Sequence, residues 1–292
     1  MAVYNLGSIN IDHIFRLSHL PKAGETLQAN HYACGLGGKG ANQSLALAMA
    51  GAQVHHIGRM AANDLHFIDP LKHAGVEMSH TLDDALASGS AIVMVDETSG
   101  ENQIILNPGG NHQIGTDQID RALAQARPGD WALTQNETNN VAYYLRQAKA
   151  QGLKVCYSAA PFVAATTVDL LPLADLLVVN EVEAQALASA LGCMVENIPV
   201  PHLLITLGAS GARYVGQEGA WLLPSPKVEA VDTTGAGDTF LGFLLAALTQ
   251  NQNIQAAMHL ALNAAALQVT RPGTAAAIPT LDEVKRFIAA HN

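Results

Sequence analysis

The stretch that decides the fold of this 292-residue chain is VDTTGAGDTFLGFLLAAL, residues 231–248. Small residues at 235–237 stand directly before an apolar run, which predicts a loop that opens a buried helix. The unpaired N–H groups at such a helix start lie at the positive end of the helix dipole and form an anion site. Asp238, in the first turn, is either a helix cap or a general base beside that site. Asp232 precedes the loop and could hold a cation or shape the turn.

On the N-terminal side of this stretch, short apolar runs alternate with amphipathic segments. Such alternation predicts an α/β fold, with a mostly parallel sheet that helices cover on both faces. The expected strands cover 3–9, 53–60, 131–135, 153–158, 176–180 and 202–208, and the expected helices include 42–51 and 141–151.

Two stretches depart from this alternation. Residues 90–106 form two β-rich runs joined by a Gly-containing turn, which predicts a hairpin, and residues 11–34 lack a helical period. Together they predict a small separate sheet, with Ile92, Met94, Ile104 and Leu106 on one apolar face. A sheet of this size is marginal alone, so we expect a second copy of the chain to cover that face.

Composition and charge exclude several classes of protein. Hydrophobic residues make up 49% of the chain and charged residues 14%, which excludes a disordered chain. The net charge of −10 argues against nonspecific binding to nucleic acid or to an anionic membrane surface. No apolar run approaches the length of a membrane span. The three distant cysteines, Cys34, Cys156 and Cys193, favour a reducing cytoplasm over a zinc or disulfide framework.

A glycine-rich segment, GLGGKGANQ at 35–43, formally matches a dinucleotide-binding fingerprint. That reading fails because the segment does not follow the first strand and has no acidic residue at the expected distance beyond it. A P-loop is excluded because glycine follows Lys39. Two interpretations stay open. The loop approaches a ligand closely and presents Lys39 and Asn42 to it, or it is a plain turn with Asn42 as an N-cap.

Two shorter motifs each allow two interpretations. Asn180 and Glu183, in VVNEVEAQAL, have the spacing of a capping box, and Glu183 could also lie near a magnesium–phosphate cluster through water. The turn that follows Thr206, in ITLGASGARYV at 205–215, can pass close to a nucleotide.

Taken together and in this order, the segments resemble the ribokinase-like, or PfkB, carbohydrate kinase family. The resemblance implies a three-layer α/β/α kinase domain over 1–292, with a mostly parallel central sheet and a small β-sheet lid formed by about 11–35 and 89–107. The segments that carry it are GSINIDHI (7–14), PKAGET (21–26), GGKGANQ (37–43), GENQIIL (100–106), NEVE (180–183), ITLGASGA (205–212), DTTGAGDTF (232–240) and VTRPG (269–273).

The resemblance also implies a role for individual residues. Asp238 corresponds to the catalytic base, which also contacts the sugar, and Gly235, Ala236 and Gly237 correspond to the anion hole. The sugar-binding positions are Asn10, Asp12, Gly38, Lys39, Asn42 and Glu137. The nucleotide-binding positions are Asn180, Thr206, Gly208 and Gly211, and Glu183 organises magnesium, through water. A potassium-type site falls on Asp232, Thr234, Gln268, Arg271 and Gly273. Ala277 replaces a serine ligand that is common in the family, and 192–202 lacks a helix that is usual there.

The implied activity is that of an ATP-dependent sugar kinase that phosphorylates the 5-hydroxyl of D-ribose. It would use ATP, Mg²⁺ and K⁺ in the cytoplasm, as a homodimer paired through the lid. A sibling kinase for fructose, deoxyribose, 2-keto-3-deoxygluconate or a nucleoside is the alternative. A catalytically silent sugar-binding protein is a remote one, because such a protein would lack the base that Asp238 supplies.

Overall fold

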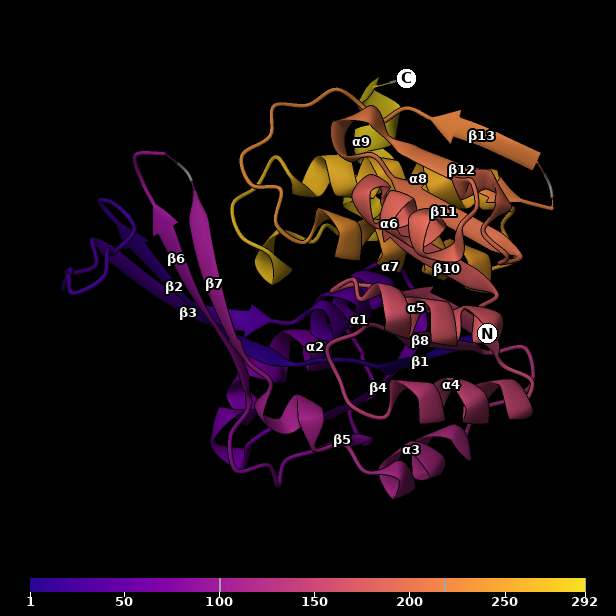
Figure 1. Cartoon of the computed structure of the whole chain (residues 1–292), viewed down its shortest axis with the longest axis horizontal. Helices are drawn as coiled ribbons and strands as arrows, with labels where there is room; N and C mark the ends of the chain where they lie inside the picture. The colour runs from indigo at the N-terminus through magenta and orange to yellow at the C-terminus, as the bar shows by residue number, and fades with distance from the viewer. Residues whose placement is uncertain (100, 218, 292) are drawn as a thin grey trace.

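Two sheets make up the framework of the computed structural model, which describes residues 1–99, 101–217 and 219–291 (Figure 1). Within these residues the larger sheet has nine strands in the order β13-β12-β11-β10-β9-β8-β1-β4-β5. Neighbouring strands are parallel from β5 to β11, and β12 and β13 add an antiparallel edge. The strands are β1 Ala2–Leu6, β4 Gln53–Arg59, β5 Thr81–Leu82, β8 Trp131–Thr134, β9 Lys154–Ser158, β10 Leu176–Asn180, β11 His202–Thr206, β12 Ala212–Gly216 and β13 Gly219–Leu223.

Helices cover both faces of this sheet, as the alternation of strands and helices predicts. One layer is formed by α1 Lys39–Met49, α2 Asp69–His73, α7 Ala236–Thr249, α8 Ile254–Gln268 and α9 Leu281–His291. The opposite layer is formed by α3 Thr116–Leu123, α4 Val141–Ala150, α5 Ala164–Leu170 and α6 Glu181–Leu191.

The core is divided in two because side chains alternate across each strand. In β8, Leu133 packs into the core beneath α7 and α8, whereas Ala132 packs into the core beneath α3 and α4. The three-layer α/β/α fold is therefore confirmed. No helix within the described residues is long and apolar enough to cross a membrane.

The packing of α1 on α7 positions the site. A Cβ added to Gly242 of α7 would lie 2.4 Å from Cβ of Ala46 in α1, so only glycine allows the helices to approach this closely. Asn42 lies one turn before Ala46, and Asp238 lies one turn before Gly242. The close contact between the two helices therefore places Asn42 beside Asp238.

The lid is a separate four-stranded sheet in the order β3-β2-β6-β7, at one side of the molecule in Figure 1. Its strands are β2 Asn10–Leu17, β3 His31–Gly37, β6 Gly89–Asp96 and β7 Asn102–Asn107. The predicted hairpin is confirmed, since β6 and β7 are antiparallel. Gly100, in its predicted turn, lies outside the described residues. The strand β2 joins the two parts of the lid by pairing with β3 on one side and with β6 on the other.

The predicted apolar face of the lid is wrong in its details. Ile92 pairs with Ile105, and Val93 pairs with Ile104, so even-numbered residues of β6 share a face with odd-numbered residues of β7. Ile104 and Leu106 therefore lie on the face of Asp12 and Ile14, while Ile92 and Met94 lie on the other face. Both faces carry exposed apolar side chains, with Ile104 55% and Ile105 58% exposed.

The first long helix begins earlier than predicted. It starts at Lys39, and Gly38 is its N-cap residue, with a φ of 91° that favours glycine. Asn42 is thus inside the first turn, and the interpretation of Asn42 as a plain N-cap is wrong. The capping box of Asn180 and Glu183 is confirmed at the start of α6.

Candidate active site

The predicted site residues gather where the parallel strands end. Glu137 follows β8, Asn180 ends β10 and Thr206 ends β11. Because parallel strands present their carboxyl ends at one edge of a sheet, these segments meet the start of α7 there. In open α/β sheets this edge is the usual place for a ligand.

Asp238 is buried in the first turn of α7, and two consecutive residues of α1 hold its carboxylate. Gln43 Nε2 donates to Asp238 Oδ1 at 2.8 Å, and Asn42 Nδ2 donates to Asp238 Oδ2 at 3.2 Å. Burial raises the pKa of Asp238 to about 6, although nearby Lys39 and the two amide donors act in the opposite direction. A carboxylate with this pKa can accept a proton near neutral pH, as a general base requires.

Glu137 joins the segment that follows β1 to the start of α1. Its Oε2 accepts hydrogen bonds from Ser8 Oγ at 2.5 Å and from the backbone N–H of Lys39 at 3.0 Å. Its Oε1 lies 3.9 Å from Lys39 Nζ. The structure thus brings Glu137 and Lys39 together, as the sequence predicts, and shows that Ser8 belongs to the same cluster.

Asp12 extends from the lid over Gly37, where an added Cβ would lie 2.0 Å from the Asp12 carboxylate. Burial and the charge of Glu137 raise the pKa of Asp12 to about 6, while Lys39 acts against them. Asp12, from the lid, and Asp238, from the body, therefore both lie near the charges of Lys39 and Glu137. Neighbouring Asn10 accepts a 2.8 Å hydrogen bond from Asn111 Nδ2.

Two cavities adjoin these residues. One, of about 510 Å³, lies between the lid and the body, and its lining includes Asp12, Ile14, Leu36, Met49 and Thr274. The other, of about 400 Å³, extends from the start of α7 and contains most of the predicted nucleotide-binding positions. Its lining includes Thr206, Gly208, Gly211, Ala236, Gly237 and Phe240. Its other walls, from β11 to α8, are largely apolar and suit a flat heterocycle.

The segments at 232–234 and 268–273 lie together, as the predicted cation site requires. The carboxylate of Asp232 accepts hydrogen bonds from the backbone N–H groups of Thr234 at 2.9 Å and Gly273 at 3.0 Å. Gln268 Nε2 donates to the carbonyl of Thr234 at 3.0 Å. Burial disfavours the charge on Asp232, but the backbone hydrogen bonds outweigh it and hold its pKa below the usual value. Arg271 bonds Glu283 through its side chain.

Asn180 and Glu183 lie apart from the lining of the 400 Å³ cavity. Asn180 N–H donates to Glu183 Oε2 at 2.8 Å, and Glu183 N–H donates to Asn180 Oδ1 at 2.9 Å. Both side chains thus cap the start of α6, and Glu183 keeps one carboxylate oxygen outside this pair of bonds.

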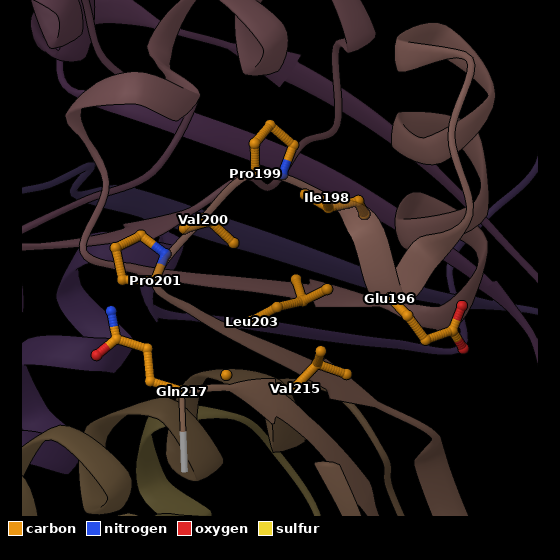
Figure 2. A pocket seen from close by; sticks show the side chains of 9 residues that line it. Glu196, Ile198, Pro199, Val200, Pro201, Leu203, Val215 and Gln217 are labelled. Carbon is orange, nitrogen blue, oxygen red and sulfur yellow. The ribbon is translucent and has the colours of Figure 1, made fainter. Parts of the chain in front are cut away.

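A further hollow of about 480 Å³ lies beside the shortened segment 192–202 (Figure 2). Ile198, Pro199, Val200 and Pro201 form one wall of it. Glu196, which lines this hollow, forms an ion pair with Arg213, with Glu196 Oε1 2.7 Å from a guanidinium nitrogen of Arg213. This hollow holds none of the predicted site residues.

Sequence reasoning missed Gln43, Gln135 and Asn111, which are all buried polar residues at the site. Gln43 is the last residue of the glycine-rich motif, and a buried glutamine that leads into an apolar helix was a usable signal. Gln135 and Asn111 gave no local signal, because their partners are distant in the sequence.

Comparisons with known proteins agree with this geometry. The family model for the pfkB family carbohydrate kinases matches residues 3–281. The chain therefore belongs to the pfkB family of carbohydrate kinases. A ribokinase of Haemophilus influenzae is 33% identical over 97% of both chains. The solved ribokinase of Thermotoga maritima is 30% identical, with a TM-score of 0.88 over 99% of both chains. The ribokinase of Arabidopsis thaliana, solved with ribose and ATP, is 25% identical, with a TM-score of 0.85 over 99% of both chains.

Proposed function

We propose that this enzyme transfers the γ-phosphoryl group of ATP to the 5-hydroxyl of D-ribose and releases ribose 5-phosphate and ADP. One observation carries the proposal: Asp238 is buried at the start of α7, with α1 holding both of its carboxylate oxygens. The similarity to ribokinases over nearly the whole chain, among them one solved with ribose and ATP, supports ribose as the acceptor.

In the proposed reaction, Asp238 accepts the proton of the sugar hydroxyl. The hydroxyl oxygen bonds to the γ-phosphorus while the bond to the bridging oxygen of ADP breaks. Backbone N–H groups at Gly235 and Gly237 bind the charge that develops on the phosphoryl oxygens, and that of Ala236 joins them by leaving its 3.3 Å hydrogen bond to the Thr233 carbonyl. These steps need a positioned hydroxyl and a preorganised anion site, which is the usual basis of phosphoryl transfer.

We assign sugar binding to side chains on both sides of the site. Asp12 and Asn10 approach from the lid, and Glu137 and Lys39 approach from the body. Gly38 and Asn42 complete the set at the start of α1. Carboxylates and amides of this kind bind sugar hydroxyls directionally, because each hydroxyl both donates and accepts a hydrogen bond.

We propose Mg²⁺ and K⁺ as the metal ions. The structure describes no group of three or more acidic, His or Cys residues that could hold a metal, so Mg²⁺ would be bound mainly by the nucleotide, with Glu183 contributing through water. For K⁺, the carboxylate of Asp232 and the carbonyls of the 268–273 segment supply oxygen ligands of the right chemistry. Thr234 and Gln268 shape this loop through their mutual hydrogen bond.

We also propose a cytoplasmic homodimer with one kinase domain over 1–292, paired through the Asp12 face of the lid. Ile14, Val93, Ile104 and Leu106 share this face, and Ile104 and Leu106 are exposed. On the other face Tyr32 stacks on His13 and packs against Phe15, which partly covers it. The Asp12 face is also continuous with the 510 Å³ cavity, so a second copy would help to enclose the sugar.

A nucleoside is the second candidate acceptor, because apolar side chains such as Ile14, Leu36 and Met49 line the cavity beside Asp12. A coupled assay of ADP release over ribose, deoxyribose, fructose, 2-keto-3-deoxygluconate and inosine distinguishes the candidates. We expect the highest kcat/KM for ribose, and higher rates in KCl than in a large organic cation at equal ionic strength. A higher kcat/KM for inosine would favour a nucleoside kinase, and no ADP release with any acceptor would reject the proposed function.

A further inference from the structure

A chain of buried amide side chains leads from Asp238 into the protein. Gln43, which holds Asp238 Oδ1, accepts a 2.7 Å hydrogen bond at its own Oε1 from Gln135 Nε2. Gln135 Nε2 also donates to Asn5 Oδ1 at 3.0 Å. Gln43 and Gln135 are each 1% exposed, so neither can exchange these partners for bulk water.

The chain continues beneath the start of α1. Asn5 Nδ2 donates to the carbonyl of Gly40 at 2.9 Å and to Ser44 Oγ at 2.8 Å. Ser44 Oγ lies 2.8 Å from His56 Nδ1. Burial lowers the pKa of His56 to about 4, so this end of the chain is neutral at pH 7. Asp238 is therefore the one charged group in this series of hydrogen-bonded side chains.

The direction of each amide follows from its neighbours. Asn5 uses Nδ2 for two acceptors, which leaves Oδ1 facing Gln135. Gln135 must then present its Nε2, and the same Nε2 reaches Gln43 Oε1. Gln43 is left with Nε2 toward Asp238. If the amide of Gln43 were reversed, its oxygen would face the carboxylate, and both interactions would be lost.

We propose that Gln43 and Gln135 are positioning residues of the phosphoryl transfer: Gln43 fixes Oδ1 of Asp238, and Gln135 fixes the direction of the Gln43 amide. This inference rests on the proposed function, in which Asp238 is the base. Both oxygens of Asp238 retain a further lone pair, so the carboxylate can still accept a hydrogen bond from the sugar hydroxyl.

The test uses Gln43→Met and Gln135→Met, which keep the side-chain length and remove the amide. Gln118→Met is the matched control: Gln118 is also a buried glutamine, but its Nε2 donates to the carbonyls of Gly58 and His80, away from Asp238. Thermal melting confirms that each variant folds. Gln135→Met carries the test if Gln43→Met does not fold.

Two measurements are made on each full-length variant. The first is kcat as a function of pH, with KM for ribose and for ATP. The second is a ¹³C NMR titration of the Asp238 carboxyl in the free protein, assigned with Asp238→Asn. We expect Gln43→Met to raise the pKa of Asp238 by about one unit and to lower kcat about tenfold, because a donor to the charged form is lost. Gln135→Met should change the pKa of Asp238 and kcat in the same directions but by less, and Gln118→Met should change neither quantity. The KM values for ribose and ATP should stay within about twofold of the wild type in all three variants.

The outcomes separate the two hypotheses. If the wild-type protein phosphorylates no acceptor, the proposed function fails, and the NMR titration alone decides whether Gln43 and Gln135 control the carboxyl of Asp238. If the wild type is active and both variants keep its kcat, pH profile and Asp238 pKa, the inference is overturned while the kinase function stands. The double variant should resemble Gln43→Met, since the two residues act in series, and fully additive losses would also contradict the inference.

Discussion

The two sheets of this protein are built under opposite conditions of burial. In the large sheet, all residues of β1 and β8 are buried between helix layers. In the lid, all six residues of β7 are exposed. The helices packed on the large sheet can hold the groups that must not move, such as Asp238 on α7 and its amide partners on α1. The lid carries Asp12 on a sheet with few packing constraints, which suits a part that closes over a sugar. We therefore expect the chemical step to depend on the buried body, and Asp12 of the lid to contribute to sugar binding beside the sugar-binding residues of the body.

The largest expected effect lies in the body. Asp238→Asn removes the proton acceptor but keeps a side chain of the same size, so kcat should fall by about 10²–10⁴-fold, the usual contribution of a general base. Steady-state kinetics with ribose and ATP measure this. A near-normal kcat would leave Asp238 as a helix cap and would break the assignment of chemistry to the body.

The next effect lies in the lid. Asp12→Ala leaves sugar hydroxyls without their charged acceptor in an enclosed site, at a cost of about 1.5–3 kcal/mol. KM for ribose should therefore rise about 10–100-fold, since each 1.4 kcal/mol is a factor of ten, while KM for ATP changes little. If KM for ATP rises and KM for ribose does not, Asp12 belongs to the nucleotide site and the comparison fails.

The pH dependence distinguishes the two carboxyls. Burial raises the pKa of Asp238 to about 6, so the base becomes protonated and kcat falls as the pH drops through 6, roughly tenfold per unit below it. Asp12, whose pKa burial also raises to about 6, should affect kcat/KM for ribose in the same range. Asp12→Asn should therefore keep the acid limb of kcat. If the acid limb of the kcat profile disappears in Asp12→Asn, the group whose protonation lowers kcat is Asp12 of the lid and not Asp238.

The smallest effect concerns the lid faces, and neighbouring residues provide the control. Ile104 and Ile105 are exposed to a similar extent but lie on opposite faces. Ile104→Glu places a charge on the Asp12 face, so we expect it to give monomers and to raise KM for ribose several-fold, whereas Ile105→Glu should stay dimeric. Light scattering at micromolar concentration measures the mass. Dimers with Ile104→Glu and monomers with Ile105→Glu would move the interface to the other face, and a monomeric wild type would reject the dimer.

The sequence was sufficient to predict those features of the structure that depend on residues close together in the chain. The capping box at Asn180, the helix with Asp238 in its first turn and the hairpin of β6 and β7 are local patterns, and all three are confirmed. The face of each lid residue was not predictable, because the register across the hairpin turn decides which residues pair. A shift of one residue transfers a side chain to the other face.

Within the site, the sequence indicated which residues gather but not how they are held. The start of α1 was misplaced because the glycines of the motif indicate a loop, whereas the loop ends at Gly38, whose φ is positive, and the helix already begins at Lys39. Gln43 and Gln135 were missed because each is defined by a partner far along the chain, Asp238 for Gln43 and Asn5 for Gln135. Such contacts come from the packing of α1 on α7 and on the large sheet, which follows from the whole fold.

The central claim is the division of labour between body and lid, and isothermal titration calorimetry of ribose tests it most directly. The measurement compares Asp238→Asn, Asp12→Ala and the wild type, each without ATP. The account predicts that Asp238→Asn, despite its loss of turnover, binds ribose with an affinity within a few-fold of the wild type, while Asp12→Ala loses about 10–100-fold. If Asp238→Asn loses as much affinity as Asp12→Ala, the roles of Asp238 in the body and Asp12 in the lid are not separate, and the account is contradicted.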